Sequence, residues 1–132
     1  MVPYRCDWLD ENIKNDIMDT MKRRYRIIYF NETVQQDLEA WPMRLRVRYQ
    51  HLTDRMKVHG GNLGEPHTKA FEDGLIEMRI KGKEGIGRVF YFSVIGFRIV
   101  MLHSFIKKSE KTPLKERRIA EKRMKAYKEG IK

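Results

Sequence analysis

The sequence predicts one α+β domain, a small antiparallel sheet with helices packed on one face. Three observations support this fold class. The chain of 132 residues is 41% apolar, which is enough for a single modest core. Its middle part alternates apolar and polar residues with the period of β-strands, in three runs separated by glycines. Segments with helical periodicity stand on both sides of these runs.

An N-terminal extension, residues 1–24, precedes the main domain, residues 25–132. Ile13, Ile17 and Met21 recur at helical spacing in it. The extension is therefore expected to form a short amphipathic helix. Its five basic and five acidic residues cancel, so it adds nothing to the net charge.

The main domain is expected to open with a strand and two helices. The β-prone run Arg26–Phe30 predicts the first strand. Residues of the following segment form one apolar helical stripe: Val34, Leu38 and Trp41. After Pro42, a second helix is expected to end at Gly60-Gly61. Its apolar stripe consists of Leu45, Tyr49, Leu52 and Met56.

A polar loop, Asn62–Gly74, leads into three predicted strands and a last helix. The strands are expected at Leu75–Lys81, Gly87–Val94 and Arg98–Ile106. Pro113 suits the first turn of the last helix, whose apolar side carries Ala120, Met124 and Tyr127. The expected order is β-α-α-β-β-β-α, with the last three strands antiparallel.

Strand register sorts the predicted sheet into two faces. A turn at residues 82–85 places Arg79 opposite Arg88, and a turn at residues 95–96 places Arg88 opposite His103. The core face would then hold Ile76, Met78, Ile80, Val89, Tyr91, Val100, Leu102 and Ile106. The opposite face would hold the row Arg79, Arg88 and His103, with Phe90, Phe105 and Lys107 beside it.

Two arginines opposite each other repel, so the row needs carboxylates or an anion. Two interpretations remain open: a solvated Arg–Glu lattice in which Glu77 neutralises the row, or a site for phosphate. His103 is either a packing residue or a base that accepts a proton near pH 7, since flanking guanidinium groups favour the neutral imidazole. Phe90 and Phe105 either stack bases or shield the strands.

The net charge of +10 is concentrated at the end of the chain, where residues 98–132 carry +8. Such a field attracts polyanions. Lys107, Lys108 and Lys111 form either a solvated loop or a phosphate clamp. The basic residues of the last helix are expected to be a solvated face that adds attraction without specificity: Lys115, Arg117, Arg118, Lys122, Arg123 and Lys125.

Several classes of protein are not indicated. No run approaches eighteen apolar residues, and no signal peptide is expected because acidic residues occupy the N-terminus. A single cysteine, Cys6, fits a reducing cytoplasm. Phosphate-binding glycine motifs are missing, and His51, His59 and His67 lack the spacing of a metal site, so no metal or cofactor is expected.

Three strings carry a resemblance to a known family: Leu75–Arg79, Arg88–Phe92 and, above all, the segment Leu102–Pro113 (LHSFIKKSEKTP). With the element order and the basic sheet face, they resemble the RelE/ParE toxin superfamily, in particular its phage-derived, HigB-type branch. The similarity spans about residues 26–129. It implies a RelE-like fold, to which residues 1–24 are an addition.

The resemblance also implies an activity. Its members are toxins of type II toxin–antitoxin systems, and this branch acts as metal-independent, ribosome-dependent mRNA endonucleases. Carried onto this chain, it makes Arg79 and Arg88 phosphate stabilisers, Lys107 and Lys108 charge stabilisers, and His103 a base or orienting group. Further RNA contacts would come from Lys69, Lys111, Arg98 and Arg118. The partners would be a helix-turn-helix antitoxin, the ribosome and mRNA in its A site, with no membrane.

Two alternatives remain open. The ParE branch shares this fold and inhibits DNA gyrase without cutting RNA. A non-catalytic nucleic-acid-binding module would also be compatible with the charge of +10.

Overall fold

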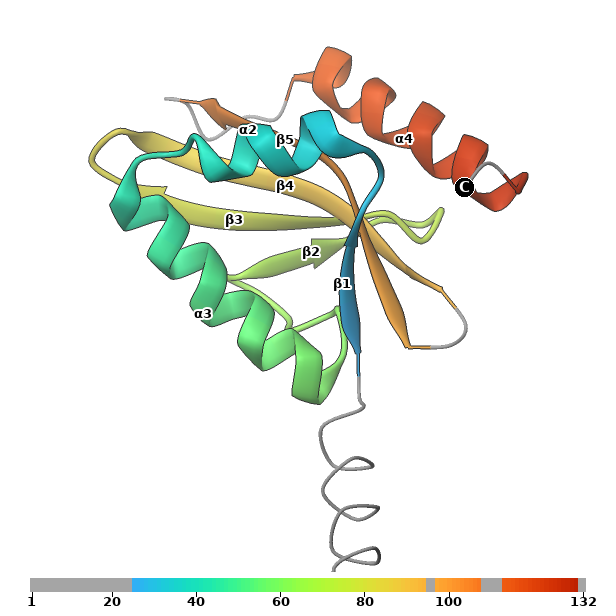
Figure 1. The fold of residues 1–132 in the computed structure, drawn as a ribbon, viewed down its shortest axis with the longest axis horizontal. Coiled ribbons are helices and arrows are strands. Elements are labelled where there is room, and N and C mark those ends of the chain that lie inside the picture. Colours follow the sequence, from blue (N-terminus) through green and yellow to red (C-terminus); the bar gives the residue numbers. More distant parts are fainter. Residues whose placement is uncertain (1–24, 95–96, 108–112, 131–132) are drawn as a thin grey trace, which may run out of the picture.

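The computed structural model describes residues 25–94, 97–107 and 113–130. The expected N-terminal helix, the turn at residues 95–96, Lys108 and Lys111 lie outside these residues. Strands and helices follow in the order β1 (Arg26–Tyr29), α2 (Glu32–Glu39), α3 (Met43–His59), β2 (Thr68–Ala70), β3 (Ile76–Gly82), β4 (Gly85–Val94), β5 (Arg98–Lys107) and α4 (Leu114–Lys128) (Figure 1).

The five strands form one sheet in the order β1-β5-β4-β3-β2. β1 is parallel to β5, and the other neighbours are antiparallel, as the short connections predicted. The α+β class is therefore confirmed, with one strand more than expected. This strand, β2, lies in the segment that was predicted to be a loop. The sequence did not indicate it, because three residues are too few to show an alternating pattern.

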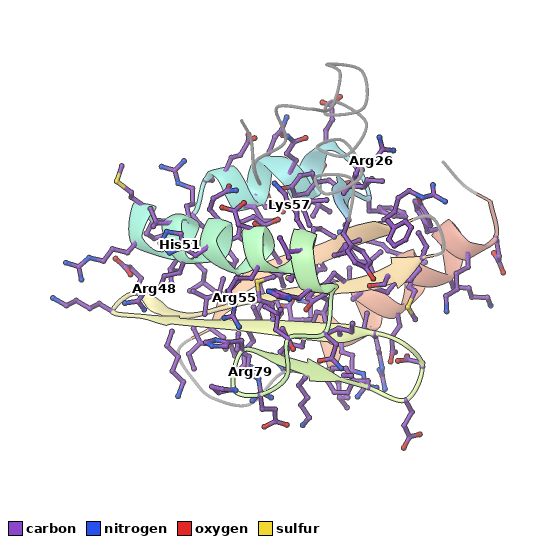
Figure 2. All side chains as sticks on the ribbon, turned by 90° about the horizontal axis from the view of Figure 1, so that it is seen from below. Arg26, Arg48, His51, Arg55, Lys57 and Arg79 are labelled. Atoms are coloured by element: carbon purple, nitrogen blue, oxygen red, sulfur yellow. The ribbon has the colours of Figure 1, made fainter. Side chains whose placement is uncertain are left out.

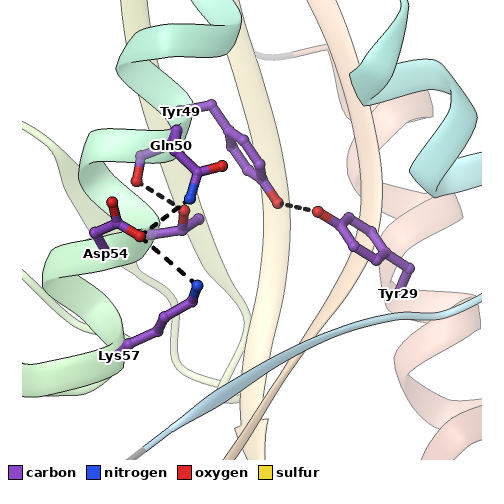
Figure 3. A network of polar contacts seen from close by, with 6 residues as sticks. Tyr29, Tyr49, Gln50, Asp54 and Lys57 are labelled. Carbon is purple, nitrogen blue, oxygen red and sulfur yellow. Dashed lines mark hydrogen bonds and ion pairs between the residues drawn. The ribbon is translucent and has the colours of Figure 1, made fainter. Parts of the chain in front are cut away.

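Helices α2 and α3 cover one face of the sheet. The Asn31 side chain caps α2 by accepting a hydrogen bond of 3.0 Å from the Val34 N–H. Every residue expected on the apolar stripes of these helices is buried. The first core cluster joins them to Ile76, Met78, Ile80, Val89, Tyr91, Ile99 and Met101 of the sheet. The hydroxyl groups of Tyr29 and Tyr49, 3.0 Å apart, link β1 to α3 (Figure 3).

Helix α4 lies on the other face, which the sequence had left uncovered (Figure 1). Ala120 and Met124 of α4 are buried in a second core cluster. Its members in and beside the sheet are Leu75, Phe90, Phe92, Val100 and Leu102. Both faces are apolar at this end of the sheet, so a single layer of helices would have left the second cluster exposed to water.

The predicted register between β4 and β5 is wrong. Arg88 pairs with Phe105, and His103 pairs with Phe90. The register shifts between Phe90 and Tyr91, which is the mark of a β-bulge. Next to the hairpin, Val94 pairs with Arg98, so three residues connect β4 to β5 where a turn of two was expected. This offset turns Val100 and Leu102 toward α4, while Ile99 and Met101 take their places in the α2–α3 core. Ile106, also expected in the core, is exposed.

Candidate nucleic-acid interface

Arg79 and Arg88 are direct cross-strand partners on β3 and β4, as the sequence predicted. The tight turn between Gly82 and Gly85 sets this register, because it leaves the two strands no freedom to slip. Gly85 occupies a φ of 133°, and an added Cβ would lie 2.9 Å from the Lys107 carbonyl oxygen. Glycine is therefore required at this corner.

A single carboxylate holds both guanidinium groups. Glu77 accepts a hydrogen bond from Arg79 Nε through Oε1 at 3.1 Å and from Arg88 Nη1 through Oε2 at 2.9 Å. The side chains of Glu77 and Arg88 are 0% exposed, whereas 30% of the Arg79 side chain is exposed. The expected neutralising role of Glu77 is thus present, and the group of three keeps a net charge of +1. Arg79 is the member of this group that a ligand can reach directly.

His103 is on the same face as this group but not opposite Arg88. Its Nε2 lies 2.6 Å from Oε1 of Glu116 on α4, and the two side chains are 14% and 24% exposed. Its ring stacks on Phe105 with a centroid distance of 5.7 Å. The sequence predicted guanidinium groups as the neighbours of His103. In the structure its neighbours are the carboxylate of Glu116 and the ring of Phe105.

A row of aromatic rings crosses this face. Phe71 contacts Phe90 at a centroid distance of 6.4 Å, and Phe90 is stacked with Phe105 at 6.1 Å. Arg117 of α4 lies over the Phe71 ring at 4.1 Å, and Lys69 of β2 lies over it at 5.7 Å. Phe90 is buried, so in this arrangement it shields the strands. Phe105 is partly exposed.

The remaining predicted RNA contacts are dispersed. Lys69 is exposed in the middle of β2, Lys107 is exposed at the end of β5, and Arg118 is exposed on α4. Arg98 donates a hydrogen bond of 3.2 Å to the Tyr127 hydroxyl, which ties the start of β5 to α4. The structure therefore brings Arg79, Arg88 and His103 together on one face and leaves the other described candidates around it.

A second cationic feature was not predicted from the sequence. A groove of about 570 Å³ lies between α3 and the outer edge of β3, and we call it the edge groove. It is lined by Arg48, His51, Leu52, Arg55, Glu65, Pro66, His67, Arg79, Ile80 and Lys81. Arg48 and Arg55 project from α3 toward β3 and Arg79, while Arg26 and Lys57 lie on the other side of α3 (Figure 2). The signal that could have indicated it is the spacing of Arg48, His51 and Arg55, which share one helical face.

Within residues 25–94, 97–107 and 113–130, no three His, Cys, Asp or Glu side chains are grouped closely enough to hold a metal ion. No helix of the same residues is long and apolar enough to cross a membrane.

Comparison with known proteins assigns the family. Residues 36–125 match the model of the family described as phage-derived protein Gp49-like (DUF891). The chain belongs to this Gp49-like family. The match contains α3, the whole hairpin of β3 and β4, β5 and most of α4, so it includes both the Arg79–Arg88 pair and the edge groove. The Gp49-like family is one of RelE/toxin-like proteins. No curated protein matches the chain.

Proposed function

We propose that this Gp49-like protein is the toxin of a type II toxin–antitoxin system and a ribosome-dependent mRNA endonuclease of the HigB type. The observation that carries the proposal is the Arg79–Arg88 pair. Two guanidinium groups fixed by one carboxylate, beside a row of aromatic rings, suit a phosphodiester with its flanking bases. Toxin-like family membership and the charge of +10 agree with this use.

The proposed reaction needs no oxidant and no added group. The ribose 2′-OH gives its proton to a base and forms a bond to the adjacent phosphorus atom. The bond from phosphorus to the 5′ oxygen breaks and this oxygen takes a proton from a lysine ammonium group or from water, which leaves a 2′,3′-cyclic phosphate and a 5′-OH. Arg79 and Arg88 stabilise the charge on the pentavalent phosphate, and His103 accepts or orients the 2′ proton. Lys107 and Lys108 stabilise charge on the leaving oxygen.

Access to this face depends on α4 in the proposal. Glu116 holds His103, and Arg117 lies over Phe71, so two contacts of α4 close one side of the aromatic row. Bound RNA would replace these contacts with its own phosphates and bases. A helix-turn-helix antitoxin would neutralise the toxin by keeping the same face closed. The enzyme would act in the cytoplasm, where it meets mRNA in the ribosomal A site.

A second candidate is a non-catalytic nucleic-acid-binding module. It is favoured by one observation, that Arg88 and His103 are each held by a carboxylate. Such a protein would bind RNA without changing its length.

Induction of the gene in bacterial cells tests the proposal. Protein synthesis is followed by incorporation of a labelled amino acid, and mRNA length by hybridisation. The endonuclease stops synthesis and shortens mRNA within minutes. Arrest with mRNA of full length contradicts the endonuclease, and a DNA-damage response together with intact mRNA would indicate a ParE-like gyrase inhibitor instead.

A further inference from the structure

The edge groove exists because β2 is short. β2 pairs only with Ile76–Met78, and beyond Met78 no strand of the described residues continues along that side of β3. The edge groove lies beside this open part of β3 and is bounded by the side chains of α3 and by the loop residues 65–67. Arg48 Nη1 donates a hydrogen bond to the Lys81 carbonyl oxygen, which ties α3 to β3 along the groove. The groove is thus built from three elements whose positions are fixed by the core and by this bond.

Two kinds of surface meet in the groove. Its lining residues include the cationic groups of Arg48, Arg55, Arg79 and Lys81 and the carboxylate of Glu65, and Arg79 is also paired with Glu77. Its apolar floor consists of Leu52, Ile80 and Pro66, and the imidazole rings of His51 and His67 add flat surfaces. A free inorganic anion would not contact the apolar floor, and a purely apolar ligand would not pair with the cationic groups. A ligand that matches the whole groove therefore carries both an anionic group and a flat or apolar part. The volume of about 570 Å³ is within the usual range for a small-molecule site.

We propose that the edge groove binds an unpaired nucleotide of single-stranded RNA. Its base packs on the apolar floor and the flat side chains, and its phosphate is held by the guanidinium groups of Arg48 and Arg55. Arg79 belongs to the groove and is also the cross-strand partner of Arg88. A strand seated in the groove therefore continues directly toward the Arg79–Arg88 pair. This inference rests on the proposed function in taking RNA as the polyanion, and it adds a binding subsite beyond the reacting phosphodiester.

An acidic peptide is the competing occupant, because carboxylates and apolar side chains could use the same surfaces. A peptide usually gains affinity at an open strand edge by adding a strand through backbone hydrogen bonds. At this edge, the Arg79 N–H already donates to the His67 carbonyl oxygen at 2.9 Å, and the Lys81 carbonyl oxygen accepts from Arg48. These backbone positions are occupied, so the edge favours a ligand recognised by side chains.

The experiment measures binding of a fluorescein-labelled oligouridylate to the purified full chain by anisotropy, over a range of salt concentrations. Arg55→Gln removes a groove cation that is exposed on α3. Arg46→Gln is the matched control, since Arg46 is an exposed arginine of the same helix that does not line the groove. We expect Arg55→Gln to weaken binding about tenfold and to lower the slope of log K against log salt by about 0.7, the value for one phosphate contact on a single strand. The control should change the affinity less than about twofold.

An equal loss of RNA affinity in Arg55→Gln and Arg46→Gln would overturn the inference. It would show that RNA is attracted by the overall positive charge and not bound at a specific site. Displacement of the RNA by an oligoglutamate peptide that binds at least as tightly would also overturn it, in favour of a protein partner. The outcome is separable from that of the proposed function. If RNA binding depends on the groove but the wild-type protein does not cut mRNA on ribosomes, only the endonuclease is contradicted. If the wild-type protein cuts mRNA but Arg55→Gln binds RNA as tightly as the wild type, only the groove is contradicted.

Discussion

Glu77 and Arg88, on neighbouring strands, form an ion pair with a distance of 2.9 Å between Oε2 and Nη1 and no exposed side-chain surface. A buried pair of this kind contributes little net stability, but removal of one partner leaves an uncompensated charge in the interior. The pair also orients Arg79, which shares the carboxylate. The arginine expected to serve the phosphate is therefore also part of the core, and its substitution has two consequences that need separate measurements.

Arg88→Ala is expected to lower the free energy of unfolding by about 3–5 kcal/mol, because Glu77 would stay buried without this partner. That is a large part of the stability of an ordinary domain, so loss of toxicity in this variant does not by itself show a catalytic role. Urea denaturation measures the loss. The double variant Glu77→Leu, Arg88→Met should recover most of it, and a loss below about 1 kcal/mol in Arg88→Ala would contradict the buried pair.

Glu116→Ala is expected to increase toxicity, because it releases His103 and loosens the cover that α4 forms. The lost pair is partly exposed, so the free energy of unfolding should fall by only about 1 kcal/mol. Growth arrest at equal protein level measures the effect. Asp54→Ala is the control, since it removes an exposed ion pair of 3.6 Å with Lys57 on α3, away from α4 and His103. Equal arrest by the two variants would show that Glu116 does not restrict this face.

Stability is expected to fall in alkaline solution. Burial raises the pKa of Tyr49 and of Tyr91, and the neighbouring Tyr29 adds to the rise at Tyr49. Unfolded tyrosines lose their proton near pH 10, so this contribution is complete below that pH and is lost as the pH rises above it. The slope should be about 1.4 kcal/mol per pH unit for each tyrosine. Denaturation curves between about pH 9 and pH 11 measure it, and Tyr49→Phe should remove about half of the slope. An unchanged slope in Tyr49→Phe would contradict this origin.

The fold was predictable where local rules determine it. The apolar stripes of α2 and α3 and the turn from Gly82 to Gly85 each act over a few residues, and all three appear in the structure as expected. The last of them correctly placed Arg79 opposite Arg88. Local propensity and global fold agree in these segments.

What could not be predicted depends on contacts between distant segments. The three-residue connection between the paired residues Val94 and Arg98 turned Val100 and Leu102 to the α4 face. Together with the bulge opposite Phe90 and Tyr91, it moved His103 away from Arg88, and neither feature has a mark in the sequence. The edge groove joins α3 to β3 across more than twenty residues. Its α3 arginines lie off the apolar stripe of this helix, and no role was predicted for them from the sequence, because only the short length of β2 brings them to the open edge of the sheet.

The central claim is that the surface around Arg79 cuts mRNA on the ribosome. Arg79→Gln tests it best, because it removes an accessible guanidinium group and leaves the buried Glu77–Arg88 pair in place. Purified protein is added to ribosomes programmed with a defined mRNA, and new 5′ ends are mapped by primer extension. We predict cuts at the A-site codon with the wild type and with Arg46→Gln, and a rate at least about a hundredfold lower with Arg79→Gln, the loss typical for one stabilising donor. Full-length mRNA with the wild-type protein, or equal cutting by Arg79→Gln, would contradict the claim.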